Sequence, residues 1–342
     1  MPSGGRPHQF DRSNLRQMIL DSPKQFAVGF DIAEGVKVDG KFERVVFSGE
    51  GGSAFPSQLL ETIVSEFAGA KAPQIITNHS YSLPAVSTAG ALNVVCSYSG
   101  NTEETISNLE EAISKKLPVI GIASGGKVEE ICKASNIPFV KLPMPSPEFQ
   151  PRMGTGYFVA AMVKLLENHG LVSGLSDEMG KNMGTVGEGL EEVERKGMEL
   201  AGKIAGKTPV VYSSEKFARL AMVWKIKFNE HAKNPAFWNF FSELNHNEMV
   251  GFTNLGERYF AVMLKDPQDD PRNLKRYDVM AKLVGEKGLE SVMFGLEGKN
   301  AFEKIFKSLL LADFTAYYLA MYNKADPTPV EMVEHFKKLL VG

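Results

Sequence analysis

Short apolar segments alternate with amphipathic helical segments along most of this chain, and no other feature limits the possible folds as strongly. The segments "RVVFSGEGG", "LNVVCS" and "LPVIGIAS" are typical of strands buried on both faces, and each precedes a segment with helical periodicity. The helix after the first of them carries Leu59, Ile63 and Phe67 on one side. Buried strands that alternate with helices predict a doubly wound parallel sheet, which binds ligands at the carboxyl ends of its strands.

The alternation occurs twice, and a length of 342 residues also favours two domains. The first half contains five predicted strands and a small-residue helix at 85–90, and the second half contains three, "TPVVYSSE", "RYFAVMLKD" and "LESVMFGL". We therefore predict four regions: an N-terminal tail with a helix at about 14–26 (1–34), a first α/β domain (35–170), a helical connector (171–207) and a second α/β domain (208–342).

The composition excludes several classes of protein. The chain is 43% hydrophobic and 23% charged with a net charge of −3, which gives no electrostatic case for nucleic acid or an anionic membrane as the main partner. Cys96 and Cys132 are too few for a disulfide framework, and we predict two buried free thiols, as in a reducing compartment. The N-terminus lacks the apolar core of a signal peptide, so we expect a cytoplasmic protein.

Two loops that follow predicted strands share one chemistry. They are "SGEGGSAF" at 48–55 and "SYSGNTEE" at 97–104. Glycine admits a ligand close to the backbone, hydroxyls donate hydrogen bonds, and the helix N-terminus after each loop favours an anion. Because neither loop matches the P-loop or Gly-x-Gly-x-x-Gly spacing, a small phosphate ester is favoured over a nucleotide. The alternative is simple helix capping, for which Asn101 and Glu104 have capping-box spacing.

Three further residues suit proton chemistry. Glu230 lies at the end of a mostly apolar helix, where partial desolvation makes a carboxylate a better base, although a surface acid is the alternative. Histidine exchanges protons near neutral pH, and His246 is either such a group or an ordinary loop residue. Arg152 follows the fifth strand and is either a cation for an anionic oxygen or a surface arginine. Glu243 and His246 form a single metal-like spacing, so we predict no metal and no cofactor.

Six motifs in order resemble the bifunctional phosphoglucose/phosphomannose isomerases, a family of sugar isomerase (SIS) domain proteins in the phosphoglucose isomerase superfamily. They are "GEGGSAF", "SYSGNTEET", "PRMGTGY", "KIKFNEHAKNPAFWN", "ELNHNEMVGF" and "DPTPVEMVEHFKKLL", and the resemblance covers about residues 40 to 340. It implies two doubly wound SIS-type domains and a metal-independent aldose–ketose isomerase. The implied reaction converts glucose 6-phosphate, and also mannose 6-phosphate, to fructose 6-phosphate through an enediolate.

The resemblance also implies roles for individual residues. Glu230 is the proton-transfer base, and Arg152 stabilises the intermediate. His246 opens the sugar ring and typically comes from the neighbouring subunit, which implies a homodimer with shared active sites. Lys337, with Lys338 as the alternative, reaches the substrate. The hexose 6-phosphate is held at its phosphate by Ser97, Ser99 and Thr102, and at its sugar by Gly51, Gly52 and Ser53.

Glu50 departs from the family pattern, which more often has an uncharged residue at this position. A carboxylate beside a phosphosugar is electrostatically unfavourable unless it points away. Two alternatives stay open: an isomerase restricted to one of the two hexose phosphates, and a sugar-phosphate sensor without catalysis.

Overall fold

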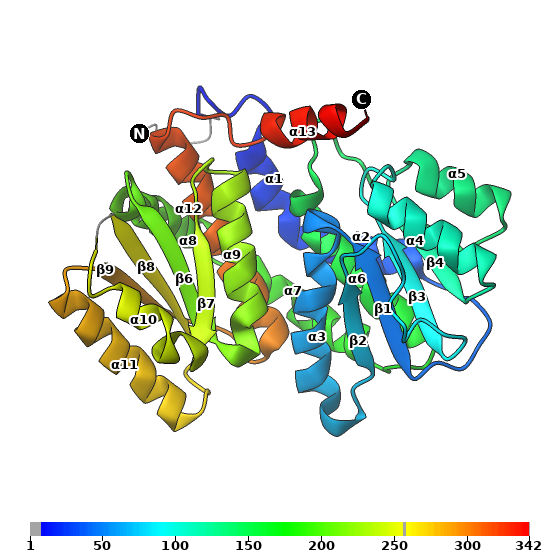
Figure 1. Cartoon of the computed structure of the whole chain (residues 1–342), viewed down its shortest axis with the longest axis horizontal. Helices are drawn as coiled ribbons and strands as arrows, with labels where there is room; N and C mark the ends of the chain where they lie inside the picture. The colour runs from blue at the N-terminus through cyan, green and yellow to red at the C-terminus, as the bar shows by residue number, and fades with distance from the viewer. Residues whose placement is uncertain (1–7, 256–257, 342) are drawn as a thin grey trace. The chain divides into compact units, whose positions relative to one another are not determined.

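The computed structural model describes residues 8–255 and 258–341, and their contacts divide the chain into two units. The N-terminal unit comprises Asp21–Glu188 and Lys299–Glu303. The C-terminal unit draws its described residues from Met1–Leu20, Gly189–Gly298 and Lys304–Gly342. Each unit contains one sheet with helices on both faces (Figure 1). The domain boundaries given above stay a prediction.

The sheet of the N-terminal unit has five strands in the order β2-β1-β3-β4-β5, and every neighbouring pair is parallel. Ser48 pairs with Asn78 on one side and with Val95 on the other, so the ends of these strands are aligned. All five strands coincide with predicted apolar segments. Their bounds are β1 Arg44–Gly49, β2 Gln74–Asn78, β3 Ala91–Cys96, β4 Val119–Ala123 and β5 Phe139–Lys141.

Helices cover both faces of this sheet. One face packs against α4 and α5 through a core that includes Val95, Leu109 and Val128, and α3 and α6 contact one another on the other face. Pro56 lies in the first turn of α3, where its missing N–H leaves no helical hydrogen bond unmade. The bounds are α2 Gln25–Ala33, α3 Phe55–Ala68, α4 Glu103–Ser114, α5 Gly126–Ala134, α6 Thr155–Asn168 and α7 Leu175–Val186.

Two predicted helices were wrong or incomplete. The segment 85–90 forms turns and bends instead of a helix, because the preceding residues are anchored to α4 by hydrogen bonds described below. The helix predicted at 14–26 is interrupted near Pro23. It consists of α1 Leu15–Asp21 and a 3-10 turn at Ser22–Lys24, and α2 then continues to Ala33.

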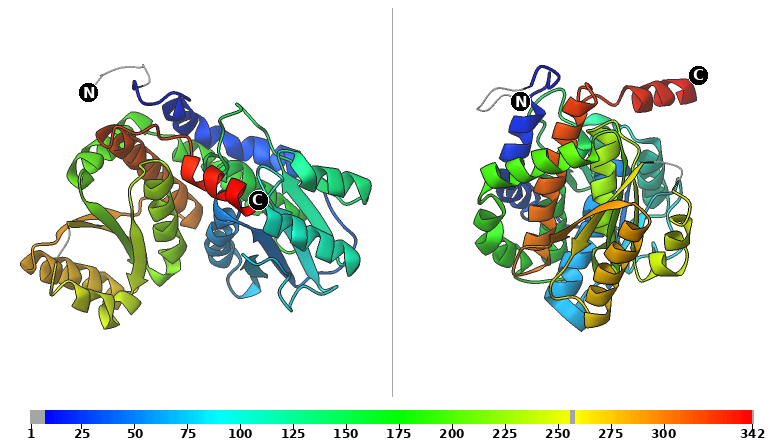
Figure 2. Two further views of the ribbon diagram at one scale, coloured as in Figure 1. Left: turned by 45° about the horizontal axis from the view of Figure 1, so that its top comes forward. Right: turned by 90° about the vertical axis from the view of Figure 1, so that its left-hand side faces the viewer.

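The sheet of the C-terminal unit has four parallel strands in the order β7-β6-β8-β9. The edge strand β7 was not predicted. Helix α11 covers one face, and α8, α9 and α12 lie on the other (Figure 1 and Figure 2). The bounds are β6 Thr208–Ser214, β7 Phe237–Phe241, β8 Tyr259–Lys265, β9 Glu290–Gly295, α8 Leu190–Ile204, α9 Ala218–Glu230, α10 Glu248–Gly251, α11 Pro271–Glu286, α12 Ala301–Tyr322 and α13 Glu331–Val341.

Both sheets are doubly wound and fully parallel, so the predicted fold class is confirmed. Cys96 and Cys132 are buried and free, as predicted, and burial raises the pKa of the Cys132 thiol to about 11. Among the described residues, we find no helix with the length and apolar character needed to cross a membrane.

Candidate active site

The loop between β3 and α4 gathers hydroxyl groups at the carboxyl edge of the first sheet. Ser97 is fully buried, and its Oγ lies 2.8 Å from Oγ1 of Thr102. The same Oγ accepts a hydrogen bond from the main-chain N–H of Gly100 at 3.1 Å. Ser99 is exposed in the same loop. The positive φ of Gly100, 71°, lets the loop turn so tightly at this point.

This loop is not a simple helix cap. Thr102 is the N-cap of α4 and makes no side-chain capping hydrogen bond. The alternative of a capping box between Asn101 and Glu104 was wrong, because the N-cap of α4 is Thr102 and Asn101 bonds within the turn. Its Nδ2 donates to the Ser99 carbonyl and its Oδ1 accepts from the Lys127 N–H, both at 3.2 Å. The N-cap side chain therefore leaves the first turn of α4 available to an anion.

The loop after β1 is joined to this one. Ser53 is buried, and its Oγ accepts a hydrogen bond from the Tyr98 N–H at 2.9 Å. Gly51 has a φ of 50°, and Gly52 lies against the chain at Pro151 and Arg152. A Cβ added to Gly52 would come within 2.5 Å of the main-chain nitrogen of Arg152, so a side chain there requires the turn that carries the arginine to move. The structure therefore brings Gly52, Ser53, Arg152 and the loop at 97–102 together.

Arg152 lies in the 3-10 turn Pro151–Met153, just before α6, and only 1% of it is exposed. The surface-arginine alternative was therefore wrong. A guanidinium keeps its charge even when buried and needs anionic or polar partners there. At the carboxyl edge of the sheet, such a cation can hold an anionic oxygen of a ligand.

Glu230 is the last residue of α9 and is half-buried. The chain after it is fixed to the segment that leads into α13. Lys233 Nζ donates to the Glu230 carbonyl and, at 2.6 Å, to the Pro329 carbonyl. His231 Nδ1 lies 3.3 Å from the Pro327 carbonyl. These contacts set the position of the helix end that carries the proposed base.

A buried charged cluster beside Glu230 was not found by the sequence analysis. Lys227 Nζ lies 2.8 Å from Oδ1 of Asp313, and His231 Nε2 lies 3.4 Å from the same oxygen. Burial by itself would raise the pKa of Asp313, but Lys227 and His231 outweigh it, and the net shift is downward. Lys227 in α9 and His231 just after it were the available signal, but their partner Asp313 lies far along the chain in α12.

His246 is exposed in the 3-10 turn Glu243–His246, which follows β7. Because α9 connects the parallel strands β6 and β7, it runs antiparallel to them and ends at their amino ends. Glu230 therefore lies near the amino end of β7, whereas His246 lies beyond its carboxyl end. The five residues of β7 span roughly 16 Å. A single C-terminal unit does not bring these two residues together.

Lys337 and Lys338 are both exposed on α13. Lys337 Nζ lies 2.8 Å from Oε1 of Glu334, one turn earlier in the same helix. These contacts do not favour either lysine as the substrate ligand, so the choice of Lys337 stays a prediction.

Comparisons with known proteins agree with this architecture. Residues 193–340 match the model of the bacterial phospho-glucose isomerase C-terminal SIS domain. The chain is 32% identical over 341 residues to a bifunctional phosphoglucose/phosphomannose isomerase of Caldicellulosiruptor bescii, covering 95% of this chain and 98% of that relative. It is also 32% identical over 301 residues to the Aquifex aeolicus protein of the same name, with coverages of 87% and 91%.

A solved structure supports the fold. The C-terminal domain of glucosamine-fructose-6-phosphate aminotransferase from Francisella tularensis superposes with a TM-score of 0.74 at 13% identity, covering 96% of this chain and 99% of that one. At that identity the match concerns the fold alone. The sequence relatives, matched over nearly their whole length, settle the family: this chain belongs to the bifunctional phosphoglucose/phosphomannose isomerases.

Proposed function

We propose that this protein is an isomerase that interconverts glucose 6-phosphate and mannose 6-phosphate with fructose 6-phosphate by proton transfer. One observation carries the proposal beyond family membership. The loop at 97–102 presents hydroxyls before a helix whose N-cap makes no side-chain capping bond, and it is hydrogen-bonded through Ser53 to the loop whose Gly52 packs against the main chain of the buried Arg152. That combination suits a phosphate ester whose reacting carbons lie next to a cation.

Phosphate binding is assigned to the loop between β3 and α4. Ser97, Ser99 and Thr102 donate hydroxyl hydrogen bonds to phosphate oxygens, and the N-terminus of α4 adds main-chain N–H groups and its dipole. Gly51, Gly52 and Ser53 border the sugar, because their loop is hydrogen-bonded to the phosphate loop through Ser53 and Tyr98. Glycine at these positions lets the sugar approach the backbone.

The chemistry requires a base, a cation and a ring-opening group. Glu230 carries the proton between C1 and C2 of the open-chain sugar, and Arg152 stabilises the enediolate oxygen formed between the two transfers. His246 moves the proton that opens and closes the ring. Lys337 adds a second cationic contact to the substrate.

We also propose that the active unit is a homodimer with shared sites. A base and a ring-opening group must both reach the same hexose within hydrogen-bond distance. Glu230 and His246 lie beyond opposite ends of β7, so one subunit supplies Glu230 and its partner supplies His246. A cytoplasmic location stays a prediction, and it is supported by the two free buried thiols.

The test of function is an assay of the wild type and Glu230→Gln with both hexose 6-phosphates. We expect isomerisation of both substrates, and a fall of about 10²–10⁴-fold in kcat for the variant, since general-base catalysis is worth that much. Glu191→Gln, an exposed residue of α8, is the matched control and should retain activity. Variant activity within tenfold of wild type rules out Glu230 as the base, and activity with only one hexose phosphate narrows the specificity.

The test of sharing is subunit mixing. Glu230→Gln and His246→Ala proteins are each expected to be nearly inactive. After random reassociation, half of the dimers contain one subunit of each variant. In such a dimer, one of the two sites combines an intact Glu230 with an intact His246. We expect recovery of about one quarter of wild-type activity. If mixing restores nothing although the subunits exchange, each site is built from one chain.

A further inference from the structure

Glu50 and His79 form a pair at the edge of the first sheet that the proposed reaction does not use. Glu50 directly follows β1, and His79 directly follows β2, the neighbouring strand. Oε2 of Glu50 lies 3.4 Å from Nδ1 of His79, and the two side chains are 37% and 45% exposed. Both therefore lie at the carboxyl edge of the sheet, where doubly wound folds bind their ligands.

The histidine is oriented from its other side. Its Nε2 lies 3.3 Å from Nε2 of Gln58, a buried residue of α3. An amide nitrogen can only donate, so Nε2 of His79 accepts and the ring proton of the neutral imidazole resides on Nδ1. In this tautomer Nδ1 can donate to Oε2 of Glu50. One carboxylate oxygen is therefore engaged by His79, and the second can accept from a ligand.

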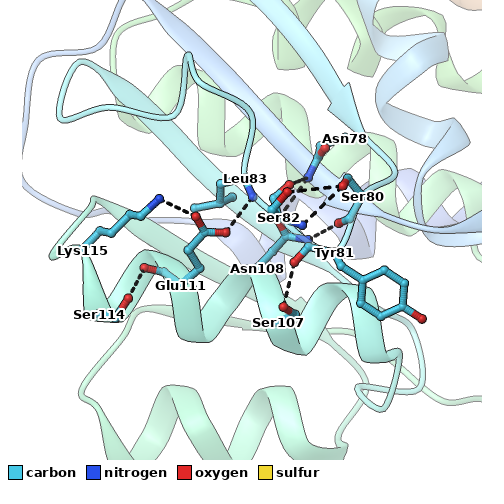
Figure 3. A network of polar contacts seen from close by, with 10 residues as sticks. All are labelled: Asn78, Ser80, Tyr81, Ser82, Leu83, Ser107, Asn108, Glu111, Ser114 and Lys115. Atoms are coloured by element: carbon cyan, nitrogen blue, oxygen red, sulfur yellow. Dashed lines mark hydrogen bonds and ion pairs between the residues drawn. The ribbon is translucent and has the colours of Figure 1, made fainter.

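The backbone on both sides of His79 is anchored to α4, as Figure 3 shows. Asn78 Nδ2 donates to the Asn108 side chain at 3.1 Å, and Asn108 Nδ2 donates to the Ser80 carbonyl at 2.6 Å. Ser107 Oγ donates to the Tyr81 carbonyl at 2.7 Å. His79 is therefore held in place by the segment around it, and Glu50 is held by His79.

Glu50 borders the crevice where the sugar is expected. The strand order β2-β1-β3-β4-β5 places the switch point between β1 and β3, whose loops are joined by the hydrogen bond between Ser53 and Tyr98. Partial burial raises the pKa of Glu50, and the nearby charge of Glu104 in the first turn of α4 raises it further, while His79 opposes both. The carboxylate is thus close to the helix that receives the phosphate.

A carboxylate in this place repels phosphate but is a good acceptor for hydroxyl groups. Resting on the proposed binding of a hexose phosphate at this loop, we propose that Glu50 is a specificity residue that accepts hydrogen bonds from the sugar hydroxyls. His79 is its positioning residue. Together they favour a sugar phosphate over phosphate alone, because only the sugar offers donors to offset the repulsion.

The test compares KM for glucose 6-phosphate with the inhibition constant of inorganic phosphate. We expect Glu50→Gln to raise KM about tenfold, since a charge-assisted hydrogen bond is lost. The inhibition constant of inorganic phosphate should stay unchanged or fall. His79→Ala should raise KM by about threefold with kcat unchanged, a split that general loss of structure does not produce. Glu61→Gln, exposed on α3, is the control, and thermal unfolding verifies that each variant is folded.

Two results contradict the inference. An unchanged or lower KM in Glu50→Gln would mean that the carboxylate makes no favourable contact with the sugar. Parallel increases in KM and in the inhibition constant of phosphate would mean that Glu50 only stabilises the conformation of the loop. The wild type separates this inference from the proposed function. If wild-type protein does not isomerise either hexose phosphate, the proposed function itself fails.

Discussion

Ser97 and Asp266 have equivalent places in two sheets of matching topology. Each follows the strand that is third in its sheet order, β3 in the N-terminal unit and β8 in the C-terminal unit. Ser97 is buried beside a hydroxyl and a main-chain N–H. Asp266 is equally buried, but it is a carboxylate whose Oδ1 lies 2.9 Å from Nζ of Lys304.

The difference shows how one architecture gives two kinds of edge. At the first edge, neutral hydroxyl and N–H groups and the N-terminus of α4, which has no side-chain cap, can interact with a negatively charged ligand. Asp266 is already paired with Lys304 through Oδ1, and a carboxylate there repels phosphate, so we infer a structural role for the second edge. The C-terminal unit contributes to the proposed chemistry from elsewhere: Glu230 comes from the opposite end of its sheet, and His246 comes from the exposed turn after β7.

The first variant places an aspartate, as in Asp266 of the C-terminal edge, at Ser97 of the N-terminal edge. We expect Ser97→Asp to lower kcat/KM by about a thousandfold, because two like charges about 4 Å apart repel by ~4 kcal/mol near a protein surface. Inhibition by inorganic phosphate should disappear as well. Ser97→Ala, which removes the hydroxyl without adding charge, is the control and should cost much less. A Ser97→Asp enzyme with normal KM would place the phosphate elsewhere.

The second variant tests the structural role of the C-terminal edge. Lys304→Met leaves Asp266 buried without its main cation, and we expect the free energy of unfolding to fall by ~3 kcal/mol. Gln268, whose Oε1 accepts from Lys304 at 2.8 Å, loses its donor as well. Denaturant unfolding measures the loss, with the exposed Lys282→Met as the control. Activity of the folded fraction should stay near wild type, and a selective rise in KM would instead assign this edge a ligand.

The third variant moves the cation without removing it. In Gly52→Ala the added methyl group would lie 2.5 Å from the main-chain nitrogen of Arg152, so the turn Pro151–Met153 that carries the arginine must shift. We expect kcat to fall by about a hundredfold, a typical cost of misplacing a catalytic group by about 1 Å. Gly180→Ala is the matched control, because a Cβ at that helical position meets nothing within 4 Å. Equal activities of the two variants would remove Arg152 from the proposed mechanism.

The smallest expected effect concerns an ion pair that ties the first helix to the C-terminal unit. Arg16 Nη2 and Nε donate to Glu194 at 2.7 and 2.5 Å, and Tyr318 donates at 2.6 Å. Burial by itself would raise the pKa of Glu194, but these donors outweigh it and lower the pKa. The stabilisation is therefore present above the unfolded pKa of a glutamate and is lost as pH falls through the lower folded value.

We expect Arg16→Met to cost about 1 kcal/mol of unfolding free energy at pH 7, a modest value for a partly exposed pair. The difference between variant and wild type should shrink as the pH falls below the unfolded pKa of a glutamate and through the lower folded pKa of Glu194. Urea unfolding at several pH values measures it. A difference that does not change with pH would mean that Arg16 acts by packing and not by its charge.

Much of the fold was predictable because apolar runs mark buried parallel strands. Strand β7 was missed since it is an edge strand whose first residue, Phe237, is 55% exposed and whose middle residue is Asn239, so it lacks a uniform apolar run. That omission also concealed the separation of Glu230 from His246. The helix predicted at 85–90 was wrong because only Ala85 and Ala89 are strong helix formers there, whereas valine, serine, threonine and glycine are weak ones, and the segment forms turns and bends.

The candidate site was predictable where it is local in sequence. Hydroxyls and glycines after β1 and β3 could be recognised from spacing alone, and the structure joins them through Ser53 and Tyr98. The burial of Arg152 was not predictable, because the turn that carries it packs against residues distant in sequence, such as Gly52, a hundred residues earlier in the chain. The ion pair of Lys227 with Asp313 likewise joins helices distant in sequence, and no local pattern indicates it.

The central claim is that phosphate binding and proton transfer reside in different units. The most direct test is calorimetric titration of glucose 6-phosphate into Glu230→Gln and Ser97→Asp, with exchange of the C2 proton followed by NMR. The account predicts that Glu230→Gln binds with near wild-type affinity but exchanges no proton, while Ser97→Asp loses binding. Loss of binding in Glu230→Gln, or retained binding in Ser97→Asp, would contradict it.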